Sequence, residues 1–167
     1  YHSLINSIIG QQISVSAANT IKLRFFDLNK NINPKNVLEI NYNVLKKCGL
    51  SRQKISYIKN ISIFFKKNIS FFKKINSFEE REIKEKLISI KGVGDWTADM
   101  FLLFSYGSPN IFPKGDLGFV KAISQSYNLK LPITDLRFDN LKKRWSPYNS
   151  IATWYLWRSL DPIPVSY

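Results

Sequence analysis

The stretch that decides the fold is residues 87–119, with the sequence LISIKGVGDWTADMFLLFSYGSPNIFPKGDLGF. Glycines at positions 92 and 94 interrupt a helical pattern, and glycine lets a backbone approach another molecule closely. We therefore predict a helix, a tight hairpin and a second helix. Backbone N–H groups at the start of the second helix, near residues 94–96, are a candidate phosphate site. Downstream, Asp116 stands in a Gly-Asp-Leu-Gly turn as a single candidate carboxylate.

The composition of the chain points to a polyanion as its partner. Its 167 residues, of which 44% are hydrophobic, suffice for one packed core or for two small helical subdomains that share a cleft. The formal net charge is +13, because 25 Lys and Arg stand against 12 Asp and Glu. Cys48 is the only cysteine and His2 the only histidine, which excludes a disulfide framework and a metal site built on several of these residues.

The sequence also predicts where the protein acts. No apolar run approaches the roughly 18 residues needed to span a membrane, and no secretory pattern precedes the first helix. We expect an intracellular monomer without a membrane partner, in the cytoplasm or nucleoid of a bacterium or in the nucleus of a eukaryote. The chain starts at Tyr1 rather than Met, inside an amphipathic pattern, so we expect residues to be missing upstream.

Helical signals follow one another along the chain, so the predicted fold class is all-α. Ser14 and Ser51 are placed to cap two of the helices, and Lys54 falls on the solvent side of the second. The last helix is predicted to begin near Pro147 and to end before Asp161-Pro162. Spacing assigns to its packed face Tyr148, Ile151, Ala152, Tyr155 and Leu156.

Several motifs, in order along the chain, carry a resemblance to a known family. They are SIIGQQIS (7–14), GLSRQK (49–54), IKGVGDWTA (90–98), FPKGDLG (112–118) and WYLWRSL (154–160). Together they resemble the helix-hairpin-helix (HhH-GPD) base-excision DNA glycosylases, and most closely the 3-methyladenine DNA glycosylase II branch. The resemblance implies one HhH-GPD domain over residues 1–167, with the hairpin at about 80–107 and an active-site cleft between two helical lobes.

The implied activity is hydrolysis of the N-glycosidic bond of alkylated purines, of the 3-methyladenine or 7-methylguanine type, in double-stranded DNA. Breaking this bond builds positive charge on the sugar, and a fixed carboxylate stabilises that charge and can orient a water. Asp116 is the candidate catalytic residue. The alternative interpretation of Asp116 is a plain helix N-cap, and the two roles are compatible.

Trp96 bears on the reaction type. Relatives that also cut the DNA strand carry a lysine nucleophile at this position, so the resemblance implies a monofunctional glycosylase without lyase chemistry. Lys91, the nearest lysine, falls in the part of the motif that approaches the DNA backbone. Trp96, Met100 and Tyr148 are the candidate walls of a pocket for a cationic base, which aromatic faces attract. Core packing is the alternative for all three, and it is the preferred interpretation of Trp154 and Trp157.

A flipped-out base leaves a gap that a side chain must fill. Gln12 is the preferred wedge, with Gln11 in support, and the alternative is two exposed amides in a polar turn. The remaining candidate contacts to DNA are Arg52, Lys54, Lys91, Gly92, Val93 and Gly94. No cofactor is required, but the resemblance implies a structural Na⁺ or K⁺ on the backbone carbonyls of Ile88, Ile90 and Val93. Two other functions stay open: a glycosylase for oxidised or deaminated bases, and a non-catalytic module that binds damaged DNA.

Overall fold

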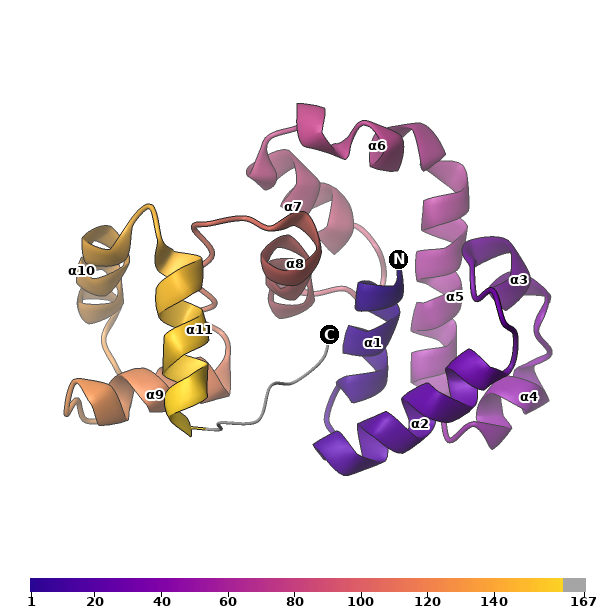
Figure 1. The fold of residues 1–167 in the computed structure, drawn as a ribbon, viewed down its shortest axis with the longest axis horizontal. Helices are drawn as coiled ribbons and strands as arrows, with labels where there is room; N and C mark the ends of the chain where they lie inside the picture. Colours follow the sequence, from indigo (N-terminus) through magenta and orange to yellow (C-terminus); the bar gives the residue numbers. More distant parts are fainter. Residues whose placement is uncertain (161–167) are drawn as a thin grey trace. The chain divides into compact units, whose positions relative to one another are not determined.

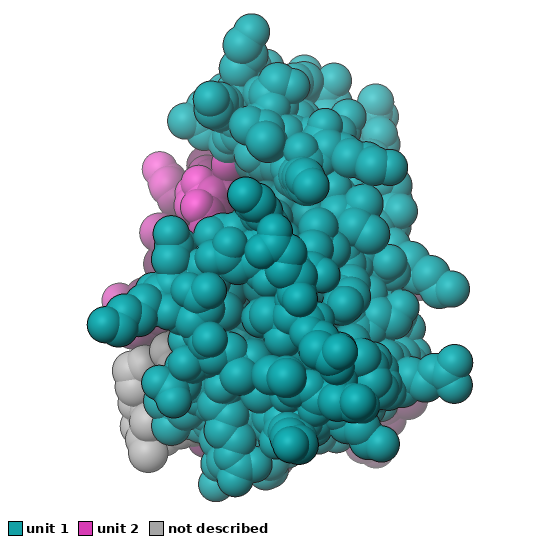
Figure 2. Space-filling model, turned by 90° about the vertical axis from the view of Figure 1, so that its right-hand side faces the viewer, with its two compact units in different colours: residues 1–98 teal, residues 99–167 magenta. Residues whose placement is uncertain are grey.

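The computed structural model describes residues 1–160, and every regular element within them is helical (Figure 1). The prediction of an all-α fold is confirmed over this range. The chain divides after Ala98 into two compact units, Tyr1–Ala98 and Asp99–Tyr167, which Figure 2 shows in different colours. The cleft between two lobes stays a prediction. Among the described helices, none has the length and apolar character needed to cross a bilayer.

Unit 1 is organised around one long helix. Its elements are α1 (His2–Gly10), α2 (Val15–Asp27), α3 (Pro34–Glu39), α4 (Tyr42–Lys47), α5 (Arg52–Lys67), α6 (Ile69–Lys73), the 3-10 turn η1 (Ile75–Ser77), α7 (Glu80–Ile88) and the start of α8 (Asp95–Phe101). Helices α1, α3, α4 and α6 all pack against α5 (Figure 1). The α5 side chains Ile55, Ile58 and Ile61 are almost wholly buried, as are Leu4 and Ile8 of α1. This apolar contact holds α1 and α5 together, so their ends have defined places.

Side-chain caps begin several helices of unit 1, two of them at the serines that the sequence predicts. Ser14 Oγ accepts the Ala17 amide at 3.3 Å, and Ser51 Oγ accepts the Lys54 amide at 3.2 Å. Asn33 Oδ1 accepts an amide at the start of α3 in the same way, at 3.0 Å. A cap of this kind contributes about 1 kcal/mol. The caps therefore help to fix the loops before α2 and α5, which carry candidate site residues.

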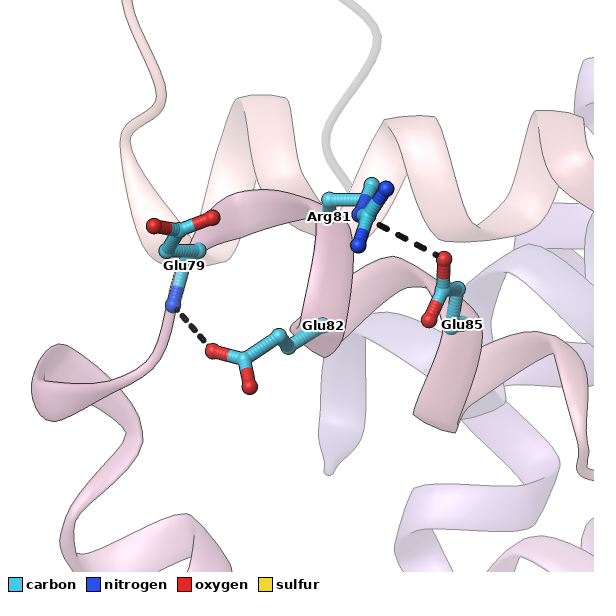
Figure 3. Close-up of polar contacts among 4 residues, drawn as sticks. All are labelled: Glu79, Arg81, Glu82 and Glu85. Atoms are coloured by element: carbon cyan, nitrogen blue, oxygen red, sulfur yellow. Dashed lines mark hydrogen bonds and ion pairs between the residues drawn. The ribbon is translucent and has the colours of Figure 1, made fainter.

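Acidic side chains start α7, the first helix of the hairpin (Figure 3). The Glu79 amide donates to Glu82 Oε2 at 2.9 Å, which is the return bond of a capping box. One turn on, Arg81 and Glu85 approach to 3.6 Å as an i, i+4 pair (Figure 3). Both of these side chains are exposed, so the pair adds little stability. Carboxylates in the first turn of α7 complement the helix dipole.

Unit 2 contains the remainder of α8, the π-helix η2 (Leu102–Tyr106), α9 (Leu117–Ser126), α10 (Asp135–Trp145) and α11 (Asn149–Leu160). Helix α11 packs against α9 and α10. Their shared core consists of Phe119, Ala122, Ile123, Phe138 and Leu156. Gly107 ends η2 with φ +80°, where the sequence predicts the second hairpin helix to stop.

The predicted packed face of α11 is correct for Leu156, which is buried, but wrong for Tyr148, Ile151 and Tyr155, each of which is more than half exposed. In their place the helix buries Asn149, Ser150 and Thr153. The reason is a set of hydrogen bonds to the loop after η2. Ser150 Oγ donates to the Ser108 carbonyl at 2.6 Å and accepts the Ile111 amide at 2.9 Å, so buried hydroxyls replace apolar contacts. The helix ends at Leu160, and the predicted stop signal at residues 161–162 lies outside the described residues.

Candidate functional site

A polar groove in unit 1 gathers most of the candidate DNA contacts. We call it the hairpin groove, and it is lined by Gln11, Gln12, Ser51, Gln53, Lys54, Tyr57, Gly92, Val93 and Gly94. Its volume is about 530 Å³. The lining comes from the α1–α2 loop, the start of α5 and the hairpin before α8. Residues far apart in the sequence, including Gln12, Lys54 and residues 92–94, therefore share one surface.

Gly92 cannot be replaced without strain at this groove. Its φ is +106°, a region that side chains rarely adopt. A Cβ at position 92 would also lie 2.2 Å from Cγ of the Tyr57 ring. Gly94 differs, because a Cβ there would meet nothing within 4 Å. Gly92 therefore sets the shape of the turn, while Gly94 leaves open space beside it.

The two glutamines of the α1–α2 loop have different environments. Gln11 is partly buried, and its Nε2 donates to Thr97 Oγ1 in α8 at 3.4 Å. Gln12 is exposed and has a left-handed backbone, with φ +57°. Strained non-glycine backbone of this kind is concentrated at functional sites. This difference favours Gln12 as the wedge and Gln11 as its support, and both roles stay predictions.

The sequence predicts Lys54 on the solvent side of α5, but its side chain is partly buried and bonded to α1. Its ammonium donates to the Ile9 carbonyl at 2.7 Å, near the C-terminal end of α1, where a cation complements the helix dipole. Partial burial lowers the pKa of Lys54. The other basic candidates, Arg52 and Lys91, are exposed and do not line the hairpin groove. Lys54 is thus the lysine that belongs to the groove, tied to α1.

The hairpin carbonyls partly fit the implied monovalent cation. The Ile90 carbonyl accepts the Val93 amide at 2.9 Å, and a carbonyl oxygen keeps a second lone pair after one such bond. In residues 1–160, no group of three or more His, Cys, Asp or Glu could hold a metal ion. The structural ion on the hairpin carbonyls stays a prediction.

The three candidate pocket residues have very different exposures. Trp96, in the first turn of α8, is partly buried. Met100 has no exposed surface, which favours the core alternative for this residue. Tyr148, immediately before α11, is 61% exposed, so its ring can meet a ligand. Of the three, Trp96 and Tyr148 keep accessible surface.

Asp116 is the N-cap of α9, with two hydrogen bonds to one carboxylate oxygen. Its Oδ1 accepts the Phe119 amide at 2.6 Å and the Trp157 indole Nε1–H at 2.9 Å. The side chain is partly buried, so one part of it stays accessible. The N-cap interpretation is confirmed. It leaves the catalytic interpretation open, because the same bonds also fix where the carboxylate lies.

The two tryptophans of α11 illustrate what the sequence does not reveal. Trp157 packs against the core of unit 2, as predicted, but it also bonds to Asp116. Trp154 is 47% exposed, so the packing prediction fails for it, and its ring lies 5.8 Å from the Arg158 guanidinium. Position 157 follows Asp116 by 41 residues, and no local signal links the two.

The glycine hairpin follows a helix with acidic residues in its first turn, and the Asp116 carboxylate lies at the start of a later helix. The family model described as "HhH-GPD superfamily base excision DNA repair protein" matches residues 5–153. The chain belongs to this family.

Individual relatives come from bacteria and yeasts. A putative DNA-3-methyladenine glycosylase of Bacillus subtilis, YfjP, is 32% identical over 96% of this chain. DNA-3-methyladenine glycosylase 1 of Schizosaccharomyces pombe is 28% identical over 95% of it. The chain covers 59% of the length of the first relative and 72% of the length of the second. It therefore spans little more than half of the B. subtilis protein.

Solved structures agree with this fold. The S. pombe 3-methyladenine DNA glycosylase Mag1, in complex with abasic DNA, superposes with a TM-score of 0.84 at 27% identity, covering 99% of this chain and 83% of that one. A DNA-3-methyladenine glycosidase from Bacillus halodurans gives a TM-score of 0.81 at 30% identity, covering 95% and 74%. The predicted family is confirmed, and the fold with it.

Proposed function

We propose that this protein removes alkylated purines, such as 3-methyladenine and 7-methylguanine, from double-stranded DNA by hydrolysing the N-glycosidic bond. The observation that carries the proposal is the Asp116 carboxylate, held by the Phe119 amide and the Trp157 indole at the start of α9. The names of the B. subtilis and S. pombe relatives support the substrate class.

The carboxylate acts on the sugar. As the bond to the base lengthens, positive charge develops at C1′ and the ring oxygen, and the anionic Asp116 stabilises it. The same carboxylate orients a water, or takes a proton from it, as the water adds to C1′. An alkylated base already carries positive charge, so it departs as a neutral base without a strong general acid. A single carboxylate is therefore enough for this class of lesion.

Recognition of the base rests on aromatic faces. A cationic purine is attracted to the negative face of a ring, and Trp96 and Tyr148 are proposed to supply such faces. Tyr148 is exposed enough to do so, whereas Met100 is fully buried and can only support the core. Preference for cationic over neutral bases follows from this arrangement.

The hairpin groove is proposed to hold the DNA backbone. Its glycine turn lets the strand approach the amides of residues 92–94, and Gln12 fills the gap that the flipped nucleotide leaves. The net charge of +13 adds affinity that is independent of sequence and falls steeply with salt. We further propose that the protein acts as a monomer without a cofactor, with Na⁺ or K⁺ on the hairpin carbonyls as a structural ion.

We also propose that the DNA strand stays intact. The resemblance to the family motif puts Trp96 at the position of the lysine nucleophile of strand-cutting relatives, and an indole forms no Schiff base. Lys91 is exposed and its carbonyl accepts a bond from Asn60, consistent with a place on the turn.

The test is a panel of duplex oligonucleotides that carry 3-methyladenine, 7-methylguanine, 8-oxoguanine, uracil or hypoxanthine. We expect release of the two methylated bases, an alkali-labile but uncut strand, and no product trapped by borohydride. Release of an oxidised or deaminated base alone would favour a glycosylase for another lesion. Tight binding to damaged DNA without release of any base would favour a binding module.

A further inference from the structure

The Asp116 carboxylate is held by donors from two different helices. The Phe119 amide belongs to α9 itself, while the Trp157 indole comes from α11. Both donate to Oδ1, at 2.6 Å and 2.9 Å. A helix cap needs only the first of these bonds. The second bond is additional, and it restricts rotation of the carboxylate about its own side chain.

The indole that makes this second bond is itself well supported. Trp157 is partly buried against the core of unit 2. The ring of Phe104, in the π-helix η2, lies nearly parallel to it, with centroids 6.0 Å apart and an interplanar angle of 17°. π-Helical turns are rare and occur frequently at functional sites. The donor therefore occupies a defined place rather than one of several rotamers.

The first turn of α9 leaves room for this bond. A Cβ at Gly118 would lie 3.2 Å from Asp116 Oδ1 and 3.7 Å from Cδ1 of Trp157. The first of these contacts is tight, whereas the second is an ordinary van der Waals contact, so a Cβ at position 118 would crowd the carboxylate oxygen beside the indole. The glycine thus keeps open the space in which carboxylate and indole meet.

We infer that Trp157 is a positioning residue, whose indole N–H holds Asp116 in the orientation that faces the sugar. The inference rests on the proposed function. A hydrogen bond to an ionised group is roughly twice as strong as a neutral one, so the indole competes well with water for Oδ1. Misplacement of a catalytic group by about 1 Å can cost on the order of 100-fold in rate.

The test compares Trp157→Phe, which keeps an aromatic ring and loses the donor, with Trp154→Phe as the matched control on the same helix. In single-turnover release of 3-methyladenine, we expect Trp157→Phe to be roughly 10-fold to 100-fold slower. Its affinity for DNA should stay unchanged, because the substitution removes no contact to the strand. Trp154→Phe should keep both properties. Trp157→His, which retains a ring N–H, should recover part of the lost rate.

A second readout needs no catalysis. The indole N–H resonance of Trp157 in a ¹H–¹⁵N spectrum should move when Asp116 becomes Asn, while that of Trp154 stays in place. If the wild type releases no base from any DNA, the proposed function fails and the positioning role fails with it, while this resonance still tests the hydrogen bond between Trp157 and Asp116. The resonance also tests that bond if Trp157→Phe does not fold.

Two results would overturn the inference. One is a wild-type release rate in folded Trp157→Phe. The other is a Trp157 resonance that does not respond to Asp116→Asn.

Discussion

The hairpin groove of unit 1 and the carboxylate of unit 2 are built in opposite ways. The groove is assembled from three chain segments, and most of its lining residues are polar residues and glycines. The carboxylate is one side chain, held by two donors to a single oxygen. Because many groups share the contact in the groove, a single substitution there should remove only part of the affinity for DNA. A reaction that depends on one carboxylate should be abolished by one substitution.

Backbone geometry separates the two regions as well. The groove contains left-handed residues, Gly92 at φ +106° and Gln12 at φ +57°. Asp116 has the ordinary extended conformation of an N-cap, with φ −84° and ψ 118°. A left-handed backbone therefore marks the surface proposed to bind DNA, whereas the proposed catalytic group has an ordinary backbone.

The largest effect on the groove is expected from Gly92→Ala. The substitution combines a positive φ with a Cβ placed on the Tyr57 ring, and together these should cost about 3 kcal/mol of stability. Affinity for duplex DNA should fall with it. Urea unfolding measures the first effect and fluorescence anisotropy the second.

Gly94→Ala is the matched control for this stability measurement, because a Cβ there meets nothing within 4 Å. Equal unfolding midpoints for the two alanine variants would contradict the role given to Gly92.

Gly118→Ala should impair the function of the carboxylate without affecting the groove. The new methyl group would sit 3.2 Å from Asp116 Oδ1, so the carboxylate must shift by a few tenths of an ångström. We expect base release to slow by roughly tenfold, with DNA affinity unchanged. Gly115→Ala, where a Cβ meets nothing within 4 Å, is the control and should keep the wild-type rate. A loss of affinity in Gly118→Ala, with a normal release rate, would contradict the assignment of catalysis to the carboxylate and of DNA binding to the groove.

Gln12→Gly should move stability and activity in opposite directions. Glycine adopts φ +57° without strain, so the variant should be at least as stable as the wild type. Without a side chain to fill the gap, base release should slow by about tenfold, because flipping a base costs a few kcal/mol. Thermal unfolding and single-turnover kinetics measure the two effects. An unchanged release rate would remove Gln12 from the wedge role and leave Gln11 as the candidate.

The smallest expected effect concerns pH. Burial lowers the pKa of Lys54, so as the pH rises this ammonium loses its proton before the exposed lysines do. Affinity for DNA should therefore weaken by about threefold between neutral pH and the range in which exposed lysines titrate. Arginine stays charged throughout, so Lys54→Arg should bind with a flatter pH profile. Identical profiles for the two proteins would show that Lys54 does not contact the strand.

Local signals account for what the sequence predicts correctly. Ser14 and Ser51 cap helices through amides three residues ahead, and such short-range contacts can be recognised from the sequence alone. The 3-10 turn η1 and helix α6 lack a side-chain cap, and the sequence does not predict them. The hairpin and its glycines are visible because their spacing is also local.

Contacts between distant segments account for the rest. The packed face of α11 depends on Ser150 bonding to a loop about 40 residues earlier, and helical periodicity assigns that face to apolar residues instead. The environment of Lys54 could not be predicted for the same reason, since its hydrogen-bond partner is the Ile9 carbonyl in another helix. For Asp116 the cap is local and predictable, but the Trp157 bond appears only when α9 and α11 pack together.

The most direct test of the account is Asp116→Asn, measured for DNA binding and for single-turnover release of 3-methyladenine from the same duplex. Asparagine is an equally good N-cap, so the fold and the hairpin groove should be preserved. We predict wild-type affinity for an abasic duplex, together with a release rate lowered by roughly 100-fold or more. A variant that binds and still releases the base at the wild-type rate would contradict the central claim that the chemistry depends on this one carboxylate.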